Sequence, residues 1–237
     1  MHRPMHAPAP QVIPPATLLL AYRSGIFPMA DRRDDPEIFW VEPRLRAVLP
    51  LDGLHCSRSL ARALRRESFE VSCNRAFAEV IEGCAAPRAG HPESWISERI
   101  AASYRVLHQA GHAHSIECWA GGHLVGGLYG VAFDRVFCGE SMFSLAPNAS
   151  KVALAWLVAA LTIAGAQLLD CQFMTEHLAS LGAVEITQAR YLALLGEACG
   201  DGVAADVPAA FAALLEGAAT GASSPGKLIA QSLTQTS

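Results

Sequence analysis

The feature that most constrains this chain is an uninterrupted apolar run at residues 152–166, which contains Trp156 and Thr162 but no charge. A run of this length is too short to cross a bilayer, which takes about 20 residues. It therefore predicts a buried helix over residues 149–164. The chain can supply a core for such a helix, because 51% of its 237 residues are hydrophobic and 17% are charged. That composition excludes disorder throughout.

The segments around this helix predict the rest of a domain. Three strands precede the helix, and strands and short helices alternate after it. The order β-β-β-α-β-α-β over residues 112–199 resembles the acetyltransferase-like (GNAT) fold, a likeness of topology that does not fix function. We expect strands at residues 114–119, 124–133, 136–142, 167–171 and 184–186, and helices at 176–181, 191–199 and 207–215.

A smaller α/β lobe is expected in front of this domain. It should hold helices at residues 16–22, 57–66 and 74–84 and strands at 46–51 and 69–73, with a loop over 28–43. Ser57 or Ser59, Asn74 and Ser97 are the expected helix N-caps. The prediction is an α/β (α+β) protein with a small N-terminal α/β domain at residues 16–95, a GNAT-like domain at 96–219, and mobile tails at 1–15 and 220–237.

Charge and cysteine content narrow the function classes. The 18 Lys and Arg against 22 Asp and Glu give a net charge of −4, which excludes a basic nucleic-acid coat but not a local basic patch. The seven cysteines are scattered and form no Cys-x-x-Cys pair, so neither a disulfide scaffold nor structural zinc is expected. With no apolar segment of signal-peptide length at the start, these features predict a cytoplasmic protein without a membrane anchor.

One segment carries a local basic patch. Arg58, Arg62, Arg65 and Arg66 follow the spacing i, i+4, i+7, i+8, which places them on one face of a helix, and no acid lies among residues 54–66. Like charges gathered on one face favour an anionic partner such as phosphate. The alternative is a solvated helix face with acids supplied from elsewhere in the fold.

Two strand ends carry candidate chemistry. Glu140, Met142 and Ser144 alternate along one strand, so they share a face suited to a ligand both apolar and cationic. Asp170 and Gln172 flank Cys171 at the end of an apolar strand, where ligands commonly collect. The alternatives are an exposed edge-strand glutamate in the first case and a helix N-cap in the second.

Cofactor motifs are not apparent. His112 and His114 share a strand face but lack a third ligand, so no metal site is expected. The glycine pairs match no standard phosphate loop, no base is identifiable for Cys171, and His177 has the position of a helix surface or cap residue.

Taken together, the motifs identify a family. The chain resembles the leucyl/phenylalanyl-tRNA–protein transferases over about residues 14–195. The likeness rests on eight segments in the family's order: 21–28 (Ala-Tyr-Arg-Ser-Gly-Ile-Phe-Pro), 46–49 (Arg-Ala-Val-Leu), 95–96 (Trp-Ile), 111–117 (Gly-His-Ala-His-Ser-Ile-Glu), 124–131 (Leu-Val-Gly-Gly-Leu-Tyr-Gly-Val), 139–144 (Gly-Glu-Ser-Met-Phe-Ser), 149–151 (Ala-Ser-Lys) and 170–172 (Asp-Cys-Gln).

The resemblance implies a reaction and its partners. Leu or Phe, and Met less well, would pass from aminoacyl-tRNA to the N-terminal amine of a protein that begins with Arg or Lys, marking that protein for degradation in the cytoplasm. An aminoacyl ester is already activated, so the transfer needs positioning and proton management and no cofactor. No DNA and no membrane partner is expected.

The resemblance also implies residue roles. Asp170 would act as general base or position the acceptor, with Gln172 as its partner and Glu140 in the same site. The amino-acid side chain and terminal adenosine would contact Trp95, Phe137, Met142 and Ser144, with Met29 where the family has Trp. The face formed by Arg58, Arg62, Arg65 and Arg66 would hold the tRNA.

Two rival functions remain at this point. A GNAT-fold acyl-CoA N-acyltransferase should show a glycine-rich turn before the long helix, whereas residues 144–150 contain no glycine. A noncatalytic tRNA-binding module would bind tRNA without any transfer.

Overall fold

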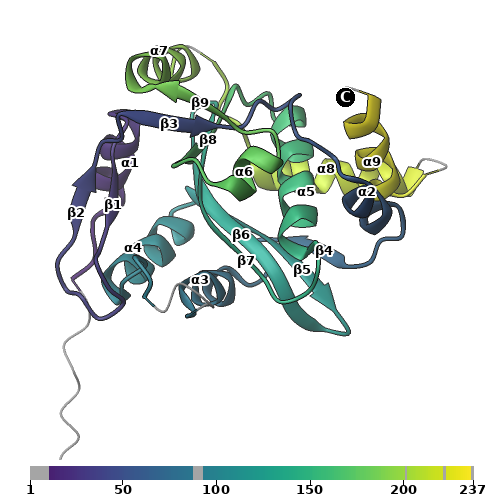
Figure 1. The fold of residues 1–237 in the computed structure, drawn as a ribbon, viewed down its shortest axis with the longest axis horizontal. Helices are drawn as coiled ribbons and strands as arrows, with labels where there is room; N and C mark the ends of the chain where they lie inside the picture. Colours follow the sequence, from purple (N-terminus) through teal and green to yellow (C-terminus); the bar gives the residue numbers. More distant parts are fainter. Residues whose placement is uncertain (1–10, 88–92, 201, 221–222, 236–237) are drawn as a thin grey trace, which may run out of the picture.

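The core of the fold is a seven-stranded mixed sheet with the strand order β4-β5-β6-β7-β8-β3-β9 (Figure 1). The structure is a computed structural model that describes residues 11–87, 93–200, 202–220 and 223–235. Among the described strands, β7 and β8 are the one pair that runs parallel. A second sheet consists of β1 and β2. The strands are β1 Phe27–Met29, β2 Phe39–Val41, β3 Leu45–Val48, β4 Glu70–Cys73, β5 Ala113–Ala120, β6 His123–Phe133, β7 Val136–Ser144, β8 Leu168–Gln172 and β9 Val184–Thr187.

Helices cover both faces of the large sheet. One apolar cluster holds α2, α5, α8 and α9, and a second holds α1, α3, α4 and α7. Leu128 and Tyr129 are neighbours on β6 and belong to different clusters, as the alternation of strand side chains requires. The helices are α1 Pro15–Arg23, α2 Arg58–Arg65, α3 Phe77–Ala85, α4 Glu98–Gln109, α5 Ala149–Ile163, α6 Glu176–Ser180, α7 Gln188–Ala198, α8 Val207–Thr220 and α9 Pro225–Gln235.

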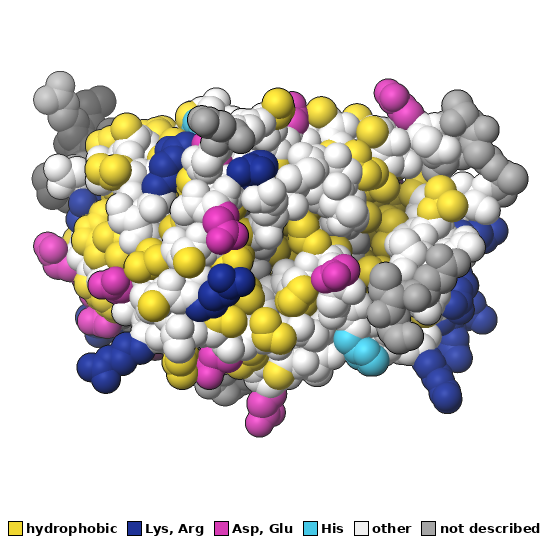
Figure 2. Space-filling view, turned by 90° about the horizontal axis from the view of Figure 1, so that it is seen from above, with side chains coloured by type: hydrophobic (Ala, Val, Ile, Leu, Met, Phe, Trp, Pro, Cys, Tyr) yellow, Lys and Arg dark blue, Asp and Glu magenta, His cyan; other side chains and the backbone are white. Residues whose placement is uncertain are grey.

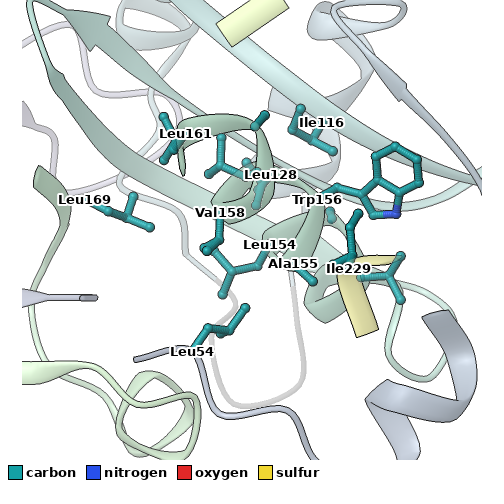
Figure 3. Close-up of a cluster of buried hydrophobic side chains, with 14 of the residues drawn as sticks. Leu54, Ile116, Leu128, Leu154, Ala155, Trp156, Val158, Leu161, Leu169 and Ile229 are labelled. Carbon is teal, nitrogen blue, oxygen red and sulfur yellow. The ribbon is translucent and has the colours of Figure 1, made fainter. Parts of the chain in front are cut away.

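Helix α5 confirms the prediction made from the apolar run. Eleven of its 15 residues are buried. Figure 3 shows side chains of α5 packed between Leu128 and Leu169 from the sheet and Ile229 from α9. The mixed α/β class predicted from the sequence is confirmed, and so are the caps of α2 by Ser57 and of α4 by Ser97.

Two expectations for the first half of the chain were wrong. Residues 28–43 do not form only a loop, because β1 and β2 pair there with Pro28 opposite Trp40. Asn74 does not cap α3, whose N-cap is Ala76. Instead Asn74 has a left-handed backbone (φ 61°), and its side chain accepts a hydrogen bond from the backbone N–H of Ser115. Short polar side chains suit both positions, so the sequence pattern alone does not separate them.

The expected tails also contain ordered packing. Ile13 is buried, and its backbone N–H donates to Ser103, while residues 1–10 lie outside the described part of the chain. The expected tail from residue 220 contains α9, whose Ile229, Ala230 and Leu233 are buried. Its Ser/Thr/Gly content hid these three apolar positions, which lie on one helix face.

The sheet also bears on the expected domains. Strands β3 and β4 fall within residues 16–95, yet they lie in the same sheet as the strands of the later segment. The division at residue 95 stays a prediction. In the described part of the chain, no helix is long and apolar enough to cross a membrane.

Candidate active site

The site begins at an irregularity in the ladder between β6 and β7. Tyr129 pairs with Ser141 and Gly130 pairs with Gly139, so Glu140 has no partner on β6. Glu140 is therefore the extra residue of a β-bulge, a feature that re-aims a side chain and is over-represented next to active sites.

The parallel pairing of β7 and β8 ends just before the bulge at Glu140. The last pair is Cys138 with Asp170, and both strands continue beyond it without pairing to each other. Glu140 and Gln172 lie just past this point, where the parallel pairing of the two strands ends. Binding sites in open sheets commonly form at such ends.

Asp170 is fully buried and holds four hydrogen bonds. Its Oδ1 accepts from Nε of Arg46 at 2.9 Å and from the backbone N–H of Gln172 at 2.8 Å. Its Oδ2 accepts from Nη2 of Arg46 at 2.6 Å and from the hydroxyl of Tyr191 at 3.1 Å. A carboxylate offers about four lone-pair sites, so this one has none left for an incoming proton.

Arg46 is the buried cation of this pair. Its Nη1 donates to the backbone oxygen of Gly25 at 3.0 Å, and its guanidinium lies 4.2 Å from the ring centre of Tyr191 and 4.9 Å from that of Phe27. Burial alone lowers the pKa of Arg46, but the hydrogen bonds and charge of Asp170 outweigh burial and raise that pKa above its ordinary value. The two side chains thus form a bidentate ion pair.

Gln172 connects the two carboxylates. Ala47 pairs with Gln172 and Val48 with Asp170, so Cys171 is the extra residue of a second bulge. Gln172 has a left-handed backbone (φ 63°), which is rare for a residue with a long side chain. The backbone N–H of Gln172 donates to Asp170, and the side-chain Nε2 of Gln172 donates to Oε1 of Glu140 at 2.9 Å.

Glu140 has neutral partners. The hydroxyl of Tyr22 donates to its Oε1 at 2.6 Å, and that of Tyr104 donates to its Oε2 at 3.1 Å. Burial raises the pKa of Glu140 to about 7, although the hydrogen bonds from Tyr22, Tyr104 and Gln172 act in the opposite direction. Glu140 is therefore poised to gain or lose a proton near neutral pH, as a general acid or base requires.

A cavity of about 250 Å³ opens beside Glu140. Pockets for drug-sized ligands run from about 300 to 1,000 Å³, so this cavity suits a side chain better than a nucleotide. Most of its lining is apolar, and its polar lining residues are Glu140, Ser141, Thr175 and His177. The other lining residues are Leu128, Tyr129, Gly139, Met142, Leu154, Leu157, Leu169, Cys171 and Leu178.

Of the five residues expected to contact the donor, Met142 lines this cavity and four do not. Phe137 is fully buried in the core, where it closes on Gly130 so tightly that a Cβ there would lie 2.3 Å from its ring. Ser144 is exposed, and its hydroxyl donates to the backbone oxygen of Ala146 at 2.8 Å in the turn before α5. The alternation of side chains along β7 predicts neither the burial of Phe137 in the core nor the exposure of Ser144.

Met29 and Trp95 lie together elsewhere. Both are partly buried against the second apolar cluster, and the backbone N–H of Ala30 donates to the oxygen of Trp95 at 3.3 Å. Tyr22 and Tyr104 belong to that cluster, so Glu140 reaches between the cavity and the cluster on which Met29 and Trp95 pack.

Sequence reasoning missed most of the cavity lining. Leu128, Leu154 and Leu169 follow ordinary strand and helix periodicity, which does not distinguish a cavity wall from a core (Figure 3). His177 is exposed on α6, as the sequence pattern predicts, and it also lines the cavity. The same pattern predicts a strand at Arg46 and gives that residue no role. The motif at residues 46–49 was the available signal for it.

Cys171 also lines the cavity. Burial raises the pKa of its thiol to about 12, so it stays protonated and is a poor nucleophile. Among the residues that the structure describes, no three His, Cys, Asp or Glu side chains are grouped to hold a metal ion.

The four arginines share one exposed face of α2. They line a hollow of about 460 Å³ together with Cys56, Ala61 and Thr234. In the described ranges, none of the four is within ion-pair distance of a carboxylate. Figure 2 shows Lys and Arg side chains gathered at the end of the molecule where Figure 1 draws α2. The alternative of a face neutralised by acids from elsewhere is therefore not met in this part of the chain.

Known proteins match this chain along most of its length. The family model for leucyl/phenylalanyl-tRNA protein transferase matches residues 48–196, and that for the family's N-terminal domain matches residues 12–44. A leucyl/phenylalanyl-tRNA–protein transferase of Novosphingobium aromaticivorans is 61% identical over 96% of this chain and 98% of its own length. Those of Rhizorhabdus wittichii and Zymomonas mobilis are each 55% identical, over 80% and 79% of this chain and 77% and 70% of theirs.

These matches place the protein among the aminoacyltransferases, enzymes that move an aminoacyl group from tRNA to a protein. The chain belongs to the leucyl/phenylalanyl-tRNA–protein transferase family.

Proposed function

We propose that this enzyme transfers Leu or Phe, and Met less well, from charged tRNA to the N-terminal amine of cytoplasmic proteins that begin with Arg or Lys, marking them for degradation. The observation that carries the proposal is that Glu140 lines a mostly apolar cavity sized for a side chain. The donor side chain would fill the cavity, which places its ester carbonyl near Glu140.

The proton-handling group in this proposal is Glu140. The acceptor amine attacks the ester carbonyl carbon, and the resulting N–H proton passes to the Glu140 carboxylate. The C–O bond to the tRNA ribose then breaks, and the leaving oxygen takes that proton. A group with a pKa near 7 suits both steps, because it accepts and returns a proton at little cost.

Asp170 takes the second of the two roles left open by the sequence, that of a positioning group. Its lone pairs are occupied by Arg46, Tyr191 and Gln172. Because Arg46 already supplies its cation, Asp170 is not the counter-ion of a cationic acceptor side chain. Instead it fixes the backbone of Gln172, whose side-chain oxygen is then available to accept a hydrogen bond from the incoming amine.

The test of the reaction is transfer of labelled Leu or Phe from charged tRNA to a protein with N-terminal Arg. Acceptors with N-terminal Lys and N-terminal Ala define the acceptor preference. Transfer to the Arg and Lys acceptors but not to the Ala acceptor is expected. Tight tRNA binding with no transfer would instead favour a noncatalytic tRNA-binding module.

The cavity predicts the donor preference. Leu and Met are unbranched at Cβ, and the cavity that Leu128, Met142 and Leu154 line should disfavour Val and Ile. A pocket of this kind discriminates by about 1–3 kcal/mol per methylene-sized misfit. Rates from Leu-, Val- and Ile-charged tRNA measure this, and equal rates would contradict it.

The arginine face of α2 is the proposed tRNA site. Changing Arg58, Arg62, Arg65 and Arg66 to Ala should weaken tRNA binding. It should also flatten the salt dependence of binding, by about one log-log unit for each phosphate that the protein no longer neutralises. An unchanged slope would show that the face is only solvated.

A further inference from the structure

The family model ends at residue 196, but this chain continues into α8 and α9. Helix α9 packs directly on α2, the helix that carries the four arginines. Ile229 and Leu233 of α9 are buried in the same cluster as Leu60 and Leu64 of α2, so the two helices share a core. Figure 1 draws them side by side.

The packing between the two helices is close at one end. A Cβ added to Gly226, at the start of α9, would lie 2.3 Å from the backbone oxygen of Leu64, near the end of α2. At the other end of α9, Thr234 lines the hollow that holds the four arginines. Helix α9 therefore runs back along α2 and forms a wall of that hollow.

This wall carries a cation of its own. Lys227 precedes Thr234 by seven residues, which is close to two helical turns, so both lie on one face of α9. Lys227 and Thr234 are exposed. Within the described ranges no carboxylate lies within ion-pair distance of Lys227.

We propose that α9 is the second wall of the tRNA site, with Thr234 bordering the path of the phosphates and Lys227 adding a fifth cation to the four of α2. This rests on the proposed tRNA binding by α2. A backbone that lies in the hollow meets positive charge from both helices. Phosphate contacts of this kind strengthen binding without reading sequence.

Three full-length variants that each lower the charge by one test the proposal. Lys227→Gln and Thr234→Glu alter the proposed wall. Ser232→Glu is the matched control, because two residues turn the helix by about 200° and place it on the opposite face. Affinity for Leu-charged tRNA is measured from low to high salt, with thermal unfolding to confirm the fold.

Lys227→Gln should lower the salt slope by about one. Thr234→Glu should weaken binding several-fold, while Ser232→Glu binds like the unchanged enzyme. Thr234→Lys should tighten binding, which loss of folding cannot imitate. Equal weakening in all three charge-lowering variants, or in none, would overturn the proposal. Failure of tRNA binding by α2 is seen separately, as unchanged binding in the quadruple arginine variant.

Discussion

Two buried carboxylates lie side by side in this site, and they have opposite surroundings. Asp170 faces the guanidinium of Arg46 in a bidentate pair. Glu140 faces only neutral donors, the hydroxyls of Tyr22 and Tyr104 and the amide of Gln172.

The difference lies in the charge of the partner. Arg46 occupies lone pairs on both oxygens of Asp170, which makes Asp170 a fixed part of the frame. Glu140 is buried and its partners are neutral, so burial raises its pKa to about 7, and Glu140 is the group that titrates near pH 7. Environment thus assigns two carboxylates two jobs.

The largest effect is expected for Glu140→Gln. Loss of a general base should lower single-turnover transfer by about 10²–10⁴-fold, with affinity for charged tRNA little changed. In the unchanged enzyme the rate should rise with pH through about 7, as Glu140 loses its proton.

That rise should disappear in Glu140→Gln. An acceptor with a less basic amine separates this limb from titration of the acceptor itself, whose pKa is ordinarily about 7.7–8.0. A full transfer rate in the variant, with the limb intact, would contradict the general-base role of Glu140.

Arg46→Met should cost stability. It leaves Asp170 buried without its cation, a change that typically costs about 3–5 kcal/mol. The double variant Arg46→Met, Asp170→Leu removes both charges and should recover much of the loss. Denaturant unfolding measures both. A cost of less than about 1 kcal/mol for the single variant would mean that the pair is not the fixed frame described above.

The pH dependence of stability should differ between Glu140→Gln and the unchanged enzyme. A raised pKa means that the folded state keeps the Glu140 proton after the unfolded state has released it, so folding stability falls as pH rises from about 4.5 to 7. The Gln variant lacks this loss. The free energy of unfolding of Glu140→Gln, relative to that of the unchanged enzyme, should therefore rise by roughly 3 kcal/mol between pH 4 and pH 8. A difference independent of pH would contradict the raised pKa.

The smallest effect is expected for Tyr104→Phe. The hydrogen bond from Tyr104 lowers the pKa of Glu140, so its loss should move the midpoint of the pH–rate profile upward by about one unit. Tyr129→Phe is the matched control. Its hydroxyl is buried without a hydrogen-bond partner, and its ring lies 5.6 Å from that of Tyr104. Equal shifts in both variants would assign the effect to packing.

Much of the fold was readable from the sequence, because the informative signals are local. The apolar run predicted α5, serines predicted the caps of α2 and α4, and alternation predicted β5 to β8. Asp170, Gln172 and Glu140 were found because polar residues interrupt apolar strands there. The structure brings these three together, while their catalytic roles stay predictions.

The rest depends on pairing between distant segments. A bulge is a property of two strands in register, so neither Glu140 nor Cys171 could be identified as an extra residue from its own strand. Tyr22 and Tyr104 reach Glu140 from helices 118 and 36 residues away in sequence. Arg46 lies on a short strand, and only its ion pair with Asp170, which is 124 residues away in sequence, explains why it is buried.

The seating of α9 on α2 has a consequence for the order in which the enzyme matures. Chains are made from the N-terminus, so α2 leaves the ribosome long before α9 exists. Until then the apolar faces of Leu60 and Leu64 lack part of their cover, and the hollow beside the arginines lacks the wall that contains Thr234. The surface proposed to bind tRNA is therefore complete only after α9 has been made, and a nascent chain without α9 presents an incomplete surface.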